Sequence, residues 1–101
     1  MFDLIIIGGG PAGCAAGVYA ARKLLKTALI TEEFGGQSTV SADIKNWIGT
    51  PHIAGEKLAK DLEAHVREYA GDVVTIVLGD RVTAVAKKDG GFTVTTRDGK
   101  T

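Results

Sequence analysis

Residues 4–17, LIIIGGGPAGCAAG, place a continuous apolar run directly before a cluster of glycines and small residues. A short isoleucine-rich run closed by glycine is typical of a buried strand, here residues 2–7. Proline suits the first helical turn because its missing N–H would have no partner there, so we expect a helix from Pro11 to about residue 25. The stretch therefore predicts a strand, a tight turn and a helix in immediate succession.

A second predicted strand over residues 27–31 completes a βαβ unit, whose two strands should be parallel. Downstream, the pattern predicts a helix over residues 55–70 and a third strand over 73–78. Two further strands, 81–87 and 92–96, should form a hairpin around the turn signal KDGG. We therefore predict an α/β fold: a Rossmann-like βαβ domain with a parallel sheet and an appended antiparallel hairpin or meander.

Residues 32–51 show no regular pattern and contain several glycines and serines. A loop of about 20 residues is unusually long for a compact domain, so it should bind something or pack on another part of the protein. The sequence ends on a second turn signal, Asp98-Gly99, which should be followed by a returning strand. We therefore expect a fragment of a longer protein, incomplete at its C-terminus, although a complete protein with an irregular end remains an alternative.

Composition narrows the class of protein. The chain has 101 residues with 12 basic and 12 acidic side chains, which predicts a single domain over 1–101 and gives no basic patch for nucleic acid. No apolar run is long enough for a transmembrane helix, and Asp3 stands where a signal peptide needs positive charge. The single cysteine excludes an internal disulfide framework. We expect a cytoplasmic protein with no membrane and no nucleic-acid partner.

The glycine cluster fits the pattern G-x-G-x-x-G in its required setting between a strand and a helix. Gly8 would allow the sharp turn, Gly10 would admit a pyrophosphate, and Gly13 would let the helix pack closely. Glu32 and Glu33, about 20 residues on, are placed to bind ribose hydroxyls and would repel a 2′-phosphate. The pattern predicts an ADP-containing dinucleotide without separating NAD from FAD; the alternative is that the glycines only close a strand–helix corner.

Several longer stretches, namely IIIGGGPAG, FGGQ, IKNWIG and GEKLAKDLEAHV, resemble the N-terminal part of thioredoxin reductases. They are equally similar to the flavoprotein component of alkyl hydroperoxide reductase. This resemblance covers nearly the whole chain and favours FAD over NAD as the cofactor. It implies a flavoprotein that passes electrons from NAD(P)H through FAD to a disulfide or another redox partner, with the nicotinamide bound outside this chain.

The resemblance also implies a set of cofactor contacts. Glu32 or Glu33 would hold the ribose of the AMP half, and Val82 would offer backbone contacts to the adenine. Asn46 would lie near the flavin or its ribityl hydroxyls. The remaining contacts would be to the pyrophosphate from Gly8, Gly10, Pro11, Ala12 and Gly13, and to the ribityl chain and flavin from Gly35, Gly36 and Gln37.

The family's reactive C-x-x-C and its second G-x-G-x-x-G are absent from these 101 residues. In the family the FAD domain is split, and its final strands follow the nicotinamide domain. The resemblance therefore implies the first segment of an FAD domain, with no catalytic residue of its own. We expect the isolated chain to be inactive as a disulfide reductase and to be completed by the remaining part of the parent flavoprotein.

Several residues have a second interpretation. Gln37 and Asn46 could be ordinary loop-capping residues, because Asn suits turns. Cys14, in the first turn of the predicted helix, is either a small packing residue or a reactive thiol. Trp47 either walls the flavin pocket or anchors the long loop. His52 and His65 are too far apart to suggest a metal site, and we interpret both as surface residues.

Two further hypotheses remain beside the flavoprotein segment. One is a non-catalytic module that binds NAD or FAD, which requires a complete chain. The other is a fragment without ligand that associates with itself, because an unpaired edge at residues 92–96 would invite pairing.

Overall fold

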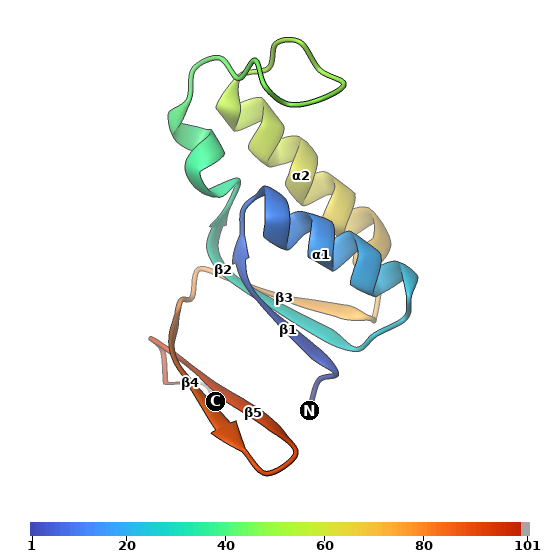
Figure 1. The fold of residues 1–101 in the computed structure, drawn as a ribbon, viewed down its shortest axis with the longest axis vertical. Coiled ribbons are helices and arrows are strands. Elements are labelled where there is room, and N and C mark those ends of the chain that lie inside the picture. The colour runs from blue at the N-terminus through green and yellow to red at the C-terminus, as the bar shows by residue number, and fades with distance from the viewer. Residues whose placement is uncertain (100–101) are drawn as a thin grey trace.

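The structure is a computed structural model that describes residues 1–99. Three parallel strands form a sheet with two helices on one face, and a separate hairpin lies on the other side (Figure 1). None of the helices described in residues 1–99 is long and apolar enough to cross a membrane. The elements are β1 (Leu4–Gly9), α1 (Pro11–Arg22), β2 (Thr27–Phe34), the 3₁₀ helix η1 (Gly36–Val40), α2 (Gly55–Ala70), β3 (Val74–Leu78), β4 (Val82–Lys88) and β5 (Gly91–Thr96).

The sheet has the strand order β1-β2-β3, with β2 in the middle and all pairs parallel. This confirms the predicted βαβ unit and the predicted α/β class. Because all three strands run in the same direction, their carboxyl ends meet at one edge of the sheet. The turn into α1 and residues 79–81 follow those ends, and Glu32 and Glu33 lie among the last residues of β2.

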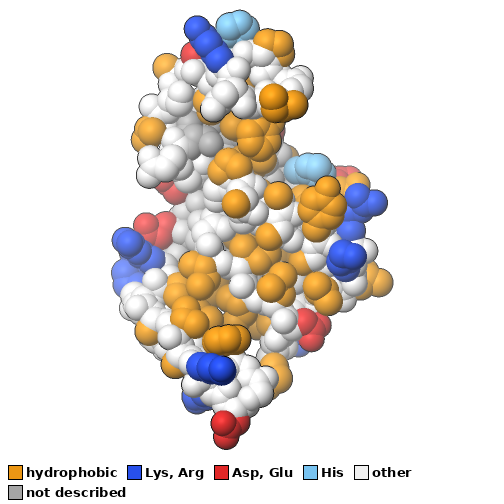
Figure 2. All heavy atoms as spheres, in the orientation of Figure 1, with side chains coloured by type: hydrophobic (Ala, Val, Ile, Leu, Met, Phe, Trp, Pro, Cys, Tyr) orange, Lys and Arg blue, Asp and Glu red, His pale blue; other side chains and the backbone are white. Residues whose placement is uncertain are grey.

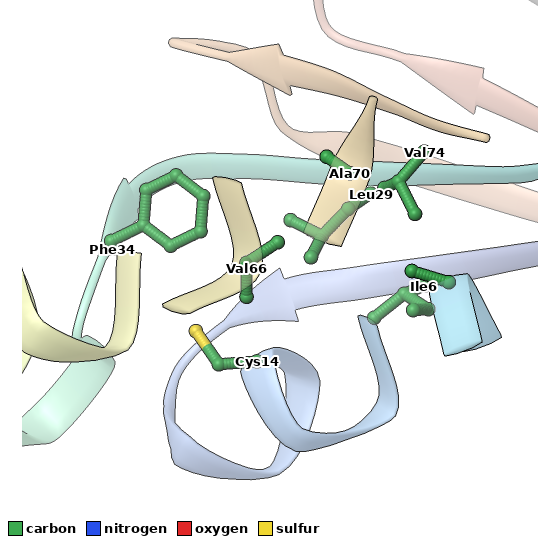
Figure 3. Packing of buried hydrophobic residues seen from close by; sticks show 8 residues of the cluster. Ile6, Cys14, Leu29, Phe34, Val66, Ala70 and Val74 are labelled. Atoms are coloured by element: carbon green, nitrogen blue, oxygen red, sulfur yellow. The ribbon is translucent and has the colours of Figure 1, made fainter. Parts of the chain in front are cut away.

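The core lies between the sheet and the two helices (Figure 3). Leu29 on β2 and Val66 on α2 are both fully buried at its centre. Gly17 brings α1 close to both: a Cβ there would lie 3.3 Å from Leu29 Cδ1 and 3.5 Å from Val66 Cγ1. Small residues on α1 therefore allow the close helix–sheet packing that buries this cluster.

Helix α1 ends at Arg22, three residues before the predicted end. Leu24 adopts the left-handed conformation, with φ 56°, and its N–H donates to the Ala21 carbonyl. The Leu25 N–H reaches back to the Ala20 carbonyl, so the two bonds form a Schellman cap. The helix was predicted to be longer because the apolar pattern continues through Leu24 and Leu25, which belong to this cap.

The segment predicted to be irregular contains more regular structure than expected. Strand β2 extends to Phe34 and is followed by η1, while residues 41–54 form a loop with two isolated bridges, Ile44 to Ile53 and Trp47 to Thr50. Helix α2 has the predicted bounds. On this helix Leu58 and Val66 are buried, whereas Tyr69 is 47% exposed.

The hairpin of β4 and β5 is confirmed, with Lys88 paired to Gly91 around a two-residue turn. Val94 and Phe92 face the side of the sheet that the helices leave uncovered, where Ile5 and Ile30 also point. The returning strand expected after Asp98-Gly99 falls outside the described residues.

Candidate functional site

The turn between β1 and α1 is built from glycine backbone with almost no room for side chains. A Cβ on Gly13 would lie 1.9 Å from the Gly8 carbonyl oxygen, and one on Gly9 would lie 2.9 Å from the Thr31 side chain. Gly8 itself has φ 102°, which favours glycine. These contacts close the turn tightly and leave its outer surface as bare backbone.

Gly10 is the N-cap of α1, and no side chain caps the helix there. A Cβ on Gly10 would meet only the Gly36 Cα, at 3.8 Å, so this position is open on one side. The first N–H groups of a helix lack intrahelical acceptors, and the helix dipole favours an anion beside them. The start of α1 therefore presents N–H groups and an open backbone surface in the same place.

A cavity of about 550 Å³ joins this turn to the ends of the neighbouring strands. Seven predicted site residues line it together, although they come from four separate segments of the chain. They are Gly8, Gly10, Glu32, Glu33, Gly36, Gln37 and Val82.

The two glutamates lie where β2 bulges away from β1. Ile7 pairs with Ile30, but the next pair is Gly9 with Phe34, so three residues of β2 lie opposite one of β1. The Thr31 hydroxyl donates to the Glu33 carbonyl at 2.7 Å across this bulge. The bulge places both carboxyl groups on the wall of the cavity, away from the regular ladder.

A further side of the cavity is formed by Asp80 and Arg81, within residues 79–81, which link β3 to β4. Asp80 is 1% exposed, and its Oδ1 accepts hydrogen bonds from the N–H groups of Arg81, at 2.8 Å, and Asp98, at 3.3 Å. The Gly79 N–H donates to the Thr31 carbonyl at 2.9 Å, which joins this link to β2. Val82 follows this link and lines the same cavity as Glu32 and Glu33, which we call the acidic wall.

Five predicted site residues do not line the cavity. Pro11 and Ala12 form the first turn of α1, and Gly13 packs against Gly8 behind the turn. Gly35, with φ 98°, packs against α2: a Cβ there would lie 2.4 Å from the Ala59 Cβ. Asn46 is exposed in the loop over residues 41–54.

Sequence reasoning missed eight lining residues that the fold brings in. They are Ile7, Gly9, Ile30, Thr31, Thr39, Val40, Asp80 and Arg81. Asp80 and Arg81 had a usable signal, since polar residues directly after a third parallel strand share the edge where ligands bind. Gly9 is the middle glycine of the cluster, a variable position of the motif. Thr31 had no signal of its own.

Cys14 belongs to the core. It is 2% exposed, and its Sγ–H donates to the Gly9 carbonyl at 3.3 Å. Burial, together with the negative charge of Glu63, raises the pKa of the thiol to about 11. The thiol is therefore protonated at neutral pH, which favours the packing interpretation over the reactive one.

Trp47 is 38% exposed and lines a separate cavity of about 240 Å³ with residues of both helices, including Cys14 and Tyr69. It does not line the cavity at the glycine turn. His52 lies 3.5 Å from an Asp43 carboxylate oxygen at the surface, and His65 lies against the Tyr69 ring.

Curated proteins similar in sequence to this chain include two kinds of redox enzyme. The chain is 41% identical over 98 residues to an alkyl hydroperoxide reductase component of Escherichia coli, a match that covers 97% of this chain and 19% of that protein. It is 43% identical over 88 residues to an NADH dehydrogenase of Bacillus subtilis, a match that covers 87% of this chain and 17% of that protein. The chain thus spans about a fifth of the length of these curated relatives.

Solved structures agree with these relatives. A thioredoxin reductase of Streptococcus pyogenes superposes with a TM-score of 0.86 at 34% identity, over 97% of this chain and 31% of that one. The thioredoxin reductase of T. acidophilum gives 0.84 at 33% identity, with the same coverage. The sequence model described as pyridine nucleotide-disulphide oxidoreductase matches residues 2–101. With the glycine turn, the acidic wall and the parallel sheet in place, the chain belongs to the pyridine nucleotide-disulphide oxidoreductase family.

Proposed function

We propose that this chain binds FAD as the first segment of the FAD domain of a larger flavoprotein. The observation that carries the proposal is the single cavity that joins the glycine turn to the acidic end of β2. Its two ends have the opposite chemistry that an ADP group needs: N–H donors for the pyrophosphate and carboxylates for the ribose hydroxyls.

The residues of the cavity fit such a ligand. Gly10 and Gly36 face each other across the turn, and a Cβ on either would point at the other backbone. The lack of both side chains opens the space that a pyrophosphate needs beside the start of α1. In the proposed complex, the turn and helix start over residues 8–13 bind the pyrophosphate, with Gly8 and Gly10 facing it. The backbone of Val82 lies beside the adenine.

The flavin end of the ligand would extend past Gly36 and Gln37, which line the same cavity. Gly35 supports this end indirectly, because its contact with Ala59 fixes the entry to η1. We propose that Asn46 reaches the flavin side from the loop over residues 41–54. FAD supplies the electron-transfer chemistry, while the residues of this chain bind and orient it.

Gly10 gives a sharp test of FAD binding. Its φ of −75° and ψ of −171° suit any residue, so Gly10→Val should fold normally while its side chain enters the cavity. Titration of the purified chain with FAD, followed by quenching of flavin fluorescence, should show binding that Gly10→Val abolishes. The matched control is Gly91→Val on β5, where a Cβ meets no atom within 4 Å. Equal FAD affinity in wild type and Gly10→Val, or no binding by the wild type, would overturn the proposal.

The parent flavoprotein would move electrons from NAD(P)H through FAD to a disulfide or another redox partner. In this chain the only thiol, Cys14, is buried in the core. We therefore expect the purified chain with FAD and NADPH to show no reduction of a disulfide substrate. Steady turnover by the pure 101-residue chain would contradict this assignment.

A second candidate is self-association, and an apolar surface favours it. Figure 2 shows hydrophobic side chains gathered in the lower half of the molecule. Ile7, Val85 and Phe92, which line the groove between sheet and hairpin, are each at least 54% exposed. Sedimentation equilibrium tests self-association: a mass that rises with concentration supports it, and a constant monomer mass excludes it.

A further inference from the structure

Arg97, directly after β5, reaches the acidic wall from a distant part of the sequence. Its Nη1 donates to Glu32 Oε1 at 2.6 Å, and its Nη2 donates to the Gly79 carbonyl at 2.9 Å. A guanidinium is planar, so two bonds to two different segments fix both its position and its plane. The Glu32 carboxylate is thereby held at a defined place relative to the ends of β2 and β3.

The base from which Arg97 extends is also fixed. The Arg97 N–H donates to the Arg81 carbonyl at 2.7 Å, and the next N–H, of Asp98, donates to buried Asp80. Asp80 binds the N–H of Arg81 with the same oxygen. The open end of the hairpin is therefore fastened to the link after β3, and the Arg97 side chain leaves from an ordered backbone.

Glu32 and Glu33 both line the cavity, but only Glu32 has its carboxylate fixed in this way. Oε2 of Glu32 and both carboxylate oxygens of Glu33 have no hydrogen-bond partner within residues 1–99. The side chains of the Arg97–Glu32 pair are 52% and 46% exposed, and such pairs add little to stability. The contact is better explained as orientation of a carboxylate that keeps one oxygen for a ligand.

We propose that Glu32 is the acid that binds the adenosine ribose, and that Arg97 is the positioning residue that aims it. This inference rests on the proposed binding of FAD. Arg97 occupies one carboxylate oxygen and leaves the other for the 2′-hydroxyl of the ribose. The hairpin thus takes part in cofactor recognition through a single side chain.

The test compares the affinity for FAD with that for an FAD analogue that lacks the adenosine 2′-hydroxyl. A hydrogen bond to a charged acceptor should give the wild type a preference of about tenfold for FAD. Glu32→Ala should reduce this preference to about twofold or less, and Arg97→Ala to about threefold, because a free carboxylate samples many positions. Arg97→Lys keeps the positive charge but has no planar group that reaches both Glu32 and the Gly79 carbonyl, so it should restore only part of the preference.

Lys57→Ala breaks an exposed ion pair with Asp61 on α2 and is the control, which should keep the full preference. Glu33→Ala removes the neighbouring carboxylate, which also lines the cavity, and tests the competing assignment: the preference for FAD over its analogue should remain, whatever happens to the affinity itself. An undiminished preference in Arg97→Ala, or its loss in Glu33→Ala instead of Glu32→Ala, would overturn the assignment. No FAD binding by the wild type would remove the proposed function and this inference together, whereas binding without preference for the 2′-hydroxyl would remove this inference alone.

Discussion

The two ends of the cavity are held by different physics. At the glycine turn, backbone meets backbone, and a Cβ on Gly13 would lie 1.9 Å from a carbonyl oxygen. At the acidic wall, a half-exposed ion pair joins Glu32 to Arg97, 65 residues away. One end is fixed by steric exclusion within a few residues, and the other by a long-range contact between flexible side chains. A substitution at Gly13 should therefore affect mainly stability, and one at Glu32 or Arg97 mainly ligand preference.

Gly13→Ala should have the largest effect on stability. Alanine is favoured over glycine inside a helix by about 1 kcal/mol, yet here its Cβ would displace the Gly8 carbonyl. We expect a net loss of about 4 kcal/mol in the free energy of unfolding, measured by urea denaturation. Gly91→Ala, in open space on the hairpin, should change it by less than about 0.5 kcal/mol. Equal stability of the two variants would refute the comparison.

Gly35→Ala should come next, at about 3 kcal/mol, because it combines a φ of 98° with a Cβ 2.4 Å from the Ala59 Cβ. Ala59→Gly alone should cost about 1 kcal/mol as a glycine inside α2. In the double variant the Cβ–Cβ clash is gone, so the total should be about 1 kcal/mol less than the sum of the single effects. Strict additivity in urea denaturation would show that the clash is not what makes Gly35 necessary.

The buried thiol of Cys14 should make the folded protein less stable at high pH. Its pKa is raised to about 11 in the folded protein, so the native state holds the thiol proton more tightly than the unfolded chain does. The contribution is complete below about pH 9 and is lost as the pH rises toward 11; of a total of about 3 kcal/mol, about 2 kcal/mol should be lost between about pH 8 and about pH 10.5. Urea denaturation at about pH 8 and about pH 10.5 should show this extra loss in the wild type but not in Cys14→Ala. Identical pH dependence in both proteins would contradict it.

Arg97→Ala should have the smallest effect on stability, below about 1 kcal/mol, because both partners of its ion pair are half exposed. The change should shrink further in about 0.5 M salt, where exposed charges are screened. Thermal denaturation in low and high salt measures both. A large, salt-independent loss would mean that Arg97 holds the hairpin in place and does more than orient Glu32.

The helices and strands that depend on consecutive residues could be predicted from the sequence. The run from Leu4 to Pro11 predicted β1, although two residues too early at each end, together with the turn and the start of α1. The pattern over residues 55–70 predicted α2 with its correct bounds. Glycine identity carries much of this information, since glycines such as Gly10 and Gly13 mark places where a side chain would fill the cavity or would not fit.

The rest depends on contacts between distant segments. The left-handed Leu24 was hidden because leucine rarely adopts that conformation, and η1 was hidden because its sequence, GQSTV, has no helical period. The link between Arg97 and Glu32 has no signature in either segment alone. The family resemblance named both glutamates without choosing, and only the folded chain distinguishes their surroundings.

The bulge in β2 has a consequence for how this site can change during evolution. The pairs on either side of it, Ile7 with Ile30 and Gly9 with Phe34, are set by the sheet and by the glycine turn, while the three residues between them bear no ladder pairing to β1. An insertion or deletion among these residues would shift the carboxylate relative to the glycine turn and leave the flanking register intact. The bulge is thus a place where the length of the chain, rather than the identity of a residue, can retune which nucleotide the domain accepts.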